Sequence, residues 1–219
     1  MSDTYGKTNG KIISFINMKG GVGKTTLCKE IGYTLATFFH KSVLFIDIDP
    51  QANLTQSLFD KFGLLNQELY DDLSDEDKKG ITITNKTIDT LFSDSVYEPT
   101  EESVIQVLDA NNKLSLIPGD LKTIFLERTN GGAPRENSID NFIINKHIAS
   151  KYEYILIDCP PTYSFYTTAA FNASDGYIVP VGVDPYSTLG IDLLENVVDK
   201  LKKADVRRYA NKELNNLGI

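Results

Sequence analysis

The segment that decides the fold is Asn17-Met-Lys-Gly-Gly-Val-Gly-Lys-Thr-Thr26, which lies between an apolar run and an amphipathic run. The apolar run over residues 11–17 predicts a buried strand, and apolar residues at helical spacing over 25–39 predict a helix. A strand, a glycine-rich loop and a helix N-terminus in this order form the arrangement that wraps a phosphate group. The stretch therefore predicts a phosphate-binding loop.

The residues of this loop have separate expected tasks. Its glycines let backbone N–H groups converge on the ligand without obstruction, and the helix presents its positive N-terminal end. Lys24 is placed to reach the β and γ phosphates, Thr25 to ligate Mg²⁺ through its hydroxyl, and Thr26 to contact the α phosphate. A chance Gly-Lys-Thr in an ordinary turn would lack this combination of features. The predicted ligand-binding residues are Lys19, Gly20, Gly21, Val22, Gly23, Lys24, Thr25 and Thr26.

Short apolar runs alternate with longer amphipathic segments along the rest of the chain. Strands covered on both faces are predicted over residues 42–47, 114–117, 154–158 and 176–183, and helices over 139–148, 167–173 and 189–203. Alternating β and α elements imply right-handed crossovers between parallel strands. The predicted fold class is α/β, a doubly wound, mostly parallel sheet flanked by helices, in a single domain that spans residues 1–219.

Acidic residues end two of these predicted strands. Asp47 and Asp49 lie at the end of the run over 42–47, and Asp158 ends the run over 154–158. The carboxyl ends of parallel strands form the edge where open α/β sheets bind ligands. Mg²⁺ prefers oxygen ligands and keeps several waters, so we expect Asp158 to act through a coordinated water. These acids complete a predicted Mg-nucleotide site.

Together these motifs resemble those of one ATPase family. Residues 19–25, KGGVGKT, match the deviant Walker A loop, KGGxGK[ST], of the ParA/MinD family, and residues 47–51, DIDPQ, resemble its switch I segment. Residues 154–158 and the Cys-Pro-Pro that follows resemble its Walker B strand and switch II. The resemblance covers nearly the whole chain and implies a P-loop NTPase fold.

The resemblance also implies roles for individual residues. Lys24 would act on the ATP of its own subunit, and Lys19 would reach the ATP of the other subunit across a dimer. Asp49 would orient or activate the attacking water and assist the Mg²⁺ shell. The implied catalytic residues are Lys19, Lys24 and Asp49, and the implied metal-site residues are Thr25, Asp49 and Asp158.

The function implied by the resemblance is that of a ParA-type Mg-ATPase with weak intrinsic hydrolysis of ATP. Its expected cofactors are ATP and Mg²⁺, and its expected partners are a second copy in an ATP-dependent homodimer, non-specific DNA, and a ParB-like or other adaptor protein that stimulates hydrolysis. Such a cycle would segregate plasmids or chromosomes, or position another cargo, in the cytoplasm on the nucleoid. No membrane partner is expected.

Two other functions stay open at this point. A MinD-like membrane-associated ATPase would need a C-terminal amphipathic helix, and residues 211–219 are too polar to form one. In the other, ATP only holds a scaffold dimer together and turnover is negligible. Lipid binding would identify the first function, and phosphate release measured with and without a stimulating partner would identify the second.

Charge is unevenly distributed along the chain. The net charge is −8, yet residues 60–110 hold thirteen acidic side chains against four lysines, so the remaining residues sum to +1. We expect an acidic, insertion-like segment at about residues 60–112, either an exposed insertion or a docking surface for a partner. Residues 200–213 carry a local charge of +4, which suits either contact with a DNA backbone or a solvated helix end.

Other features exclude several classes of protein. A content of 41% hydrophobic and 24% charged residues excludes a largely disordered chain, and no apolar run is long enough for a membrane span. Cys28 and Cys159 lack the spacing of a disulfide framework or a zinc site and are expected to be buried. Iron–sulfur relatives of the family need paired cysteines that face a dimer axis, and Cys28 has no matching position, so the resemblance implies no cluster. His40 and His147 are expected at the surface or in packing. Relatives in the family continue beyond the strand predicted at residue 217, so we expect the chain to be a fragment or a short member.

Overall fold

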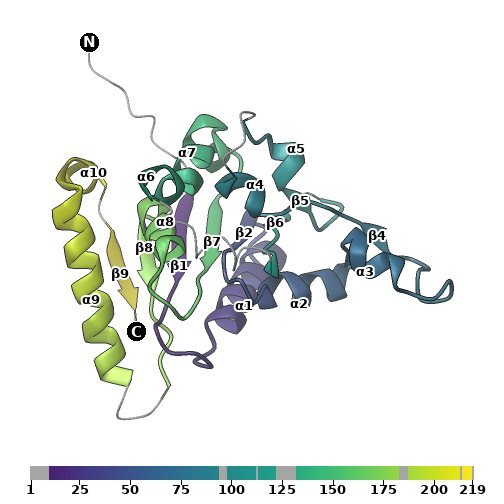
Figure 1. The fold of residues 1–219 in the computed structure, drawn as a ribbon, viewed down its shortest axis with the longest axis horizontal. Coiled ribbons are helices and arrows are strands. Elements are labelled where there is room, and N and C mark those ends of the chain that lie inside the picture. Colours follow the sequence, from purple (N-terminus) through teal and green to yellow (C-terminus); the bar gives the residue numbers. More distant parts are fainter. Residues whose placement is uncertain are drawn as a thin grey trace.

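The fold is built on one mixed sheet, seen in a computed structural model that describes residues 10–93, 98–111, 113–121, 132–182, 187–212 and 214–218. Within these residues the sheet has seven strands in the order β5-β6-β2-β7-β1-β8-β9, of which only β5 runs antiparallel to its neighbour (Figure 1). The strands are β1 (Lys11–Phe15), β2 (Val43–Asp47), β5 (Gln106–Val107), β6 (Leu114–Ile117), β7 (Tyr154–Asp158), β8 (Gly176–Ile178) and β9 (Asn215–Gly218). The predicted fold class is confirmed.

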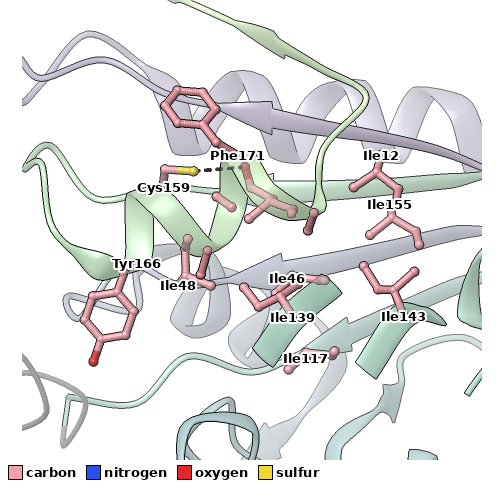
Figure 2. Close-up of a cluster of buried hydrophobic side chains, with 14 of the residues drawn as sticks. Ile12, Ile46, Ile48, Ile117, Ile139, Ile143, Ile155, Cys159, Tyr166 and Phe171 are labelled. Atoms are coloured by element: carbon pink, nitrogen blue, oxygen red, sulfur yellow. Dashed lines mark hydrogen bonds between the residues drawn. The ribbon is translucent and has the colours of Figure 1, made fainter. Parts of the chain in front are cut away.

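Both faces of the sheet are buried because successive residues of the central strands are apolar and their side chains alternate between the two faces. In β2, Val43 and Phe45 pack on one face while Leu44 and Ile46 pack on the other. Helices α1 (Lys24–Thr37) and α2 (Asn53–Phe62) cover the first face. Helices α4 (Asp89–Phe92), α7 (Ser138–Asn145), α8 (Phe165–Ala173) and α9 (Ser187–Ala204) cover the second. Figure 2 shows this second core, in which isoleucines of the strands lie beside Ile139 and Ile143 of α7.

Helix α1 packs on the sheet through its smallest side chains. The helix is predicted correctly, but Leu27 and Phe38 of its apolar stripe are 38% and 78% exposed. The buried side is formed by Cys28, Gly32 and Ala36, because a Cβ added at Gly32 would lie 2.2 Å from the Phe45 ring. Close approach of the helix backbone to the sheet thus decides which side is buried.

The acidic segment divides into an arm and a part that belongs to the core. Residues 64–83 contain β3 (Leu64–Leu65), α3 (Gln67–Asp71) and β4 (Thr82–Ile83), which project to the right in Figure 1. After them the chain returns to the core, where α4 and α5 (Glu101–Val104) bury Phe92 and Val104. Helix α5 ends at Val104, because residues 106–107 pair with β6 as an edge strand.

The C-terminal part lies against the opposite edge of the sheet. Helix α9 leads into α10 (Val206–Asn211) and then into β9, the predicted strand at residue 217. The strand predicted over 176–183 ends at Ile178, and residue 183 lies outside the described residues. The remaining described helices are α6 (Gly132–Glu136) and a 3₁₀ turn, η2 (Ile148–Ser150).

Candidate active site

The glycine-rich loop joins β1 to α1 and has the open shape that its sequence predicts. Gly21 and Gly23 adopt φ values of +74° and +85°, which L side chains rarely adopt. A Cβ added at Gly20, Gly21 or Gly23 would meet no atom of the described part of the chain within 4 Å. The loop therefore leaves a cradle at the N-terminus of a 14-residue helix, where the helix dipole favours an anion.

Lys24, the first residue of α1, is held inside this loop. Its side chain is buried, and Nζ lies 3.3 Å from the backbone carbonyl oxygen of Lys19, to which it donates a hydrogen bond. Burial of an ammonium group is costly unless the charge is compensated. An anion in the cradle would provide that compensation.

Asn17 fixes the first turn of the loop. Its side chain is buried, its Oδ1 accepts a hydrogen bond of 2.9 Å from the Lys19 backbone N–H, and its Nδ2 donates one of 2.7 Å to the Pro180 carbonyl. The residue thus ties the position of Lys19 to the segment that follows β8. This role was not predicted, since an Asn at the end of a strand gives no sequence signal of the groups to which it will bond.

Asp47 and Asp158 lie side by side at the carboxyl edge of the sheet, because β2 and β7 are neighbours and these two residues are in register. Asp47 Oδ2 accepts hydrogen bonds from both the backbone N–H and the hydroxyl of Thr55, at 2.8 and 2.7 Å. Burial raises the pKa of Asp47 to about 7, although the bonds from Thr55 oppose this shift. Asp47 therefore secures the start of α2.

Asp158 is the buried polar group without a conventional partner at this edge. It is fully buried, and neither carboxylate oxygen accepts a hydrogen bond of normal geometry from the described residues. Burial raises its pKa well above the usual range, as does the nearby Asp47, while Thr25 and Lys24 lower it. A divalent cation here would satisfy the carboxylate, so the residues present fit Mg²⁺ together with a phosphate in the cradle.

Asp49 lies at the start of a tight turn that leads into α2. Its Oδ1 accepts a hydrogen bond of 2.9 Å from the Gln51 N–H, and its side chain is 7% exposed. Ala52 has a left-handed backbone, φ +50°, which is strained for a residue with a Cβ. Thr55 holds this turn in place, because its hydroxyl also accepts a hydrogen bond of 2.8 Å from the Gly119 N–H. The roles of Thr55 and Gly119 depend on the fold and were not predicted.

The structure brings most of the predicted site residues to one edge of the sheet. Asp47, Asp49, Thr25 and Lys24 are all close enough to Asp158 to shift its pKa. Lys19, Gly20, Gly21, Gly23 and Thr26 are exposed around this centre, and Val22 is half-buried. Among the described residues no cluster of three or more His, Cys, Asp or Glu side chains forms a metal cage, so a cation here would depend on phosphate and water oxygens as well.

The other candidate residues lie outside this centre or are inert. Cys28 and Cys159 are buried as predicted, and burial raises the pKa of both thiols well above the ordinary value, so both stay protonated. His40 and His147 are exposed. None of the described helices combines the length and apolar character needed to cross a bilayer.

Comparison with known proteins places this geometry in a family. A family model described as an AAA domain, AAA_31, matches residues 10–215. The sporulation initiation inhibitor protein Soj of Bacillus subtilis is 34% identical over 194 residues, which cover 89% of this chain and 67% of Soj. The chain belongs to the ParA-type family of ATPases. The chromosome partitioning protein ParA of Myxococcus xanthus is 30% identical over 196 residues, 90% of this chain and 60% of that protein.

Solved structures agree with this membership. A plasmid partition protein from Borrelia burgdorferi has a TM-score of 0.72 and 26% identity, covering 95% of this chain and 78% of that one. A further structure from this species, bound to AMPPNP, has a TM-score of 0.71 and 26% identity, covering 95% and 74% of the two chains. This ParA-type chain thus spans about two thirds of the length of the first relatives and about three quarters of these structures.

Proposed function

We propose that this ParA-type chain is a Mg²⁺-dependent ATPase that forms a dimer with ATP, binds DNA without sequence preference in that state, and hydrolyses ATP when a partner protein stimulates it. The observation that carries the proposal is Asp158, a buried carboxylate without a conventional partner among the described residues, beside Thr25 and Lys24 under an open glycine loop. When bound, Mg-ATP supplies the cation for this carboxylate and the phosphoryl group for transfer to water. The relative bound to AMPPNP supports ATP as the ligand.

The residues of the site would divide the work as follows. Lys24, which donates to the Lys19 carbonyl, would turn to the phosphates and neutralise their charge. The Thr25 hydroxyl and Asp158 would hold the Mg²⁺ shell. Asp49 has Oδ1 fixed by the Gln51 N–H, so we assign its Oδ2 to accept a hydrogen bond from the attacking water.

Lys19 is the residue that would make the site depend on a dimer. It is exposed at the mouth of the loop, while its backbone is fixed by Asn17. A lysine held in this way could reach a nucleotide bound by the facing subunit. An additional cation at the transferred phosphate stabilises charge in the same way as an arginine finger.

Contact with DNA would involve only part of the basic C-terminal region. Arg208 donates to Asp140 at 2.6 Å and Lys212 lies 3.5 Å from the same carboxylate, so these two cations are used within the fold. Lys200 and Lys203 are exposed at the end of α9. We assign backbone contact to these lysines together with Lys202, and such contact does not read sequence.

Replacing Lys19 with Ala tests the proposal. The unchanged chain should be a monomer with ADP and a dimer with ATP and Mg²⁺, as measured by light scattering after size exclusion. Lys19→Ala should bind ATP yet remain monomeric. Lys29→Ala is the matched control, because Lys29 lies on α1 and bonds Ser57, and it should dimerise normally. A Lys19→Ala protein that dimerises with ATP as the unchanged chain does would refute the assignment.

A further inference from the structure

A groove separates the acidic arm from the body of the molecule. It has a volume of about 680 Å³ and is lined by α2, by residues 65–69 and 84–89, and by residues 118–121 after β6. We call it the arm groove. Thr55 and Gly119 lie in its lining, so the groove borders the hydrogen bonds that hold Asp47 and the turn at Asp49.

Apolar side chains line the groove from both sides. Phe59 contributes from α2, Leu69 from the arm, and Leu121 from the segment after β6. Leu69 and Leu121 are 55% and 57% exposed, although both are large apolar residues. Exposed apolar side chains gathered in a concave surface are typical of a binding site.

The charge of the groove is strongly negative. Among the described residues, its lining contains Asp60, Glu68, Asp89 and Asp120 and one lysine, Lys86. The Lys86 ammonium donates a hydrogen bond of 2.7 Å to the Ile105 carbonyl, which ties it to the fold. The arm adds further acids between residues 71 and 77. Such a potential attracts cationic groups and repels nucleic acid.

Shape restricts the occupant further. The volume lies within the roughly 300–1,000 Å³ typical of ligand pockets, so the groove takes a few side chains of an extended segment rather than a folded domain. Its walls are joined by backbone hydrogen bonds, from the Ile88 N–H to the Pro118 carbonyl at 2.7 Å and from the Thr84 N–H to the Leu65 carbonyl at 2.9 Å. A preformed groove avoids part of the ordering cost of binding.

We propose that the arm groove docks a cationic peptide segment of a partner protein, with lysine or arginine side chains against its acids and one or two apolar side chains between Leu69 and Leu121. That this partner is also the protein that stimulates ATP hydrolysis rests on the proposed function. The structural link is Thr55, which lines the groove and also donates to Asp47. An occupant that moves α2 would therefore move the turn that holds Asp49.

Selection from a peptide library tests the docking site. Random peptides about twelve residues long, displayed on phage, are selected on the full chain without nucleotide and again with ADP. Selected sequences should be net positive and contain leucine or aromatic residues. Labelled synthetic copies of the selected peptides should bind the Asp60→Lys/Glu68→Lys variant about tenfold more weakly than they bind the unchanged chain, as measured by fluorescence anisotropy. The control is Asp75→Lys/Glu76→Lys, which makes the same charge change on the arm outside the groove.

A second pair of variants separates apolar docking from simple charge attraction. Leu69→Ser leaves the net charge unchanged and should weaken binding severalfold, whereas Ile144→Ser, at an exposed position on α7, should not. Neutral or acidic selected peptides, or equal losses in groove and control variants, would overturn the proposal. Because these measurements use no ATP, they remain informative if ATP-dependent dimerisation fails, and their failure leaves the Lys19 test unaffected.

Discussion

Asp158 shows how one residue can be costly to the fold and necessary for the site. Its carboxylate is buried next to Asp47, and both have raised pKa values because burial disfavours the charged forms. Bound Mg²⁺ with ATP would reverse that penalty. We therefore expect the substitution Asp158→Asn to have opposite effects on thermal stability without and with bound Mg-ATP.

Without nucleotide, Asp158→Asn should be more stable than the unchanged chain at pH 8, by about 2–6 °C in Tm. A carboxyl whose pKa is raised by folding stabilises the fold while it is protonated, and this contribution is lost as the pH rises through the folded pKa. The difference should therefore narrow toward pH 5. With Mg²⁺ and ATP the order should reverse, because only the unchanged chain gains from the cation.

Scanning fluorimetry across pH, with and without Mg-ATP, measures both effects. Asp192→Asn is a suitable control, because Asp192 is exposed on α9 and its substitution removes the same charge. An Asp158→Asn protein that is less stable than the unchanged chain at pH 8 without nucleotide would show that the buried carboxylate carries no such penalty.

At the scale of elements, α1 joins the glycine loop to the sheet through a close backbone contact. Gly32 lies against the Phe45 ring, whereas Phe38 is largely exposed. We therefore expect stability to be sensitive to a change at Gly32, inside the helix, and insensitive to a change at Phe38, which follows its last residue. The large side chain of Phe38 should therefore matter less for the stability of the fold than the absence of a side chain at Gly32.

Gly32→Ala should lower the free energy of unfolding by about 1–3 kcal/mol, because the added methyl group overpacks the contact and outweighs the gain in helix propensity. Phe38→Ala should change it by less than about 0.5 kcal/mol. Urea unfolding measures both values. If Phe38→Ala proves the more damaging change, the side of α1 that packs on the sheet has been assigned wrongly.

The elements also show what the sequence could predict. Local sequence patterns are enough to predict the strand, loop and helix around residues 11–39. They also predict the acids at strand ends, and therefore that these acids and the loop lie at the same edge of the sheet. Edge strand β5 was not predicted, because two residues form a strand only where β6 offers a partner. The buried side of α1 and the contacts of Asn17 and Thr55 depend on distant residues, which local sequence does not reveal.

At the scale of the whole molecule, charge divides the surface between two expected partners. The acidic arm projects from one end of the sheet, and α9 and α10 lie at the other (Figure 1). In the latter region, Arg208 joins α10 to α7 by its bond to Asp140 and to α8 by a bond of 3.0 Å to the Asn172 carbonyl. Helix α8 begins shortly after Asp158 and its Cys-Pro-Pro segment, so the basic end is packed against an element that starts at the site.

In the proposed function, the nucleotide state controls binding of this molecule to DNA. The most direct test measures binding of random-sequence duplex DNA by an Asp49→Ala variant, which should hold ATP without hydrolysis, with ATP and then ADP over a series of salt concentrations. The account predicts binding with ATP alone, a steep loss with salt, and a shallower salt dependence when Lys200 and Lys203 are also replaced by Ala. Equal binding with ADP, or no binding by an ATP-dependent dimer, would contradict it.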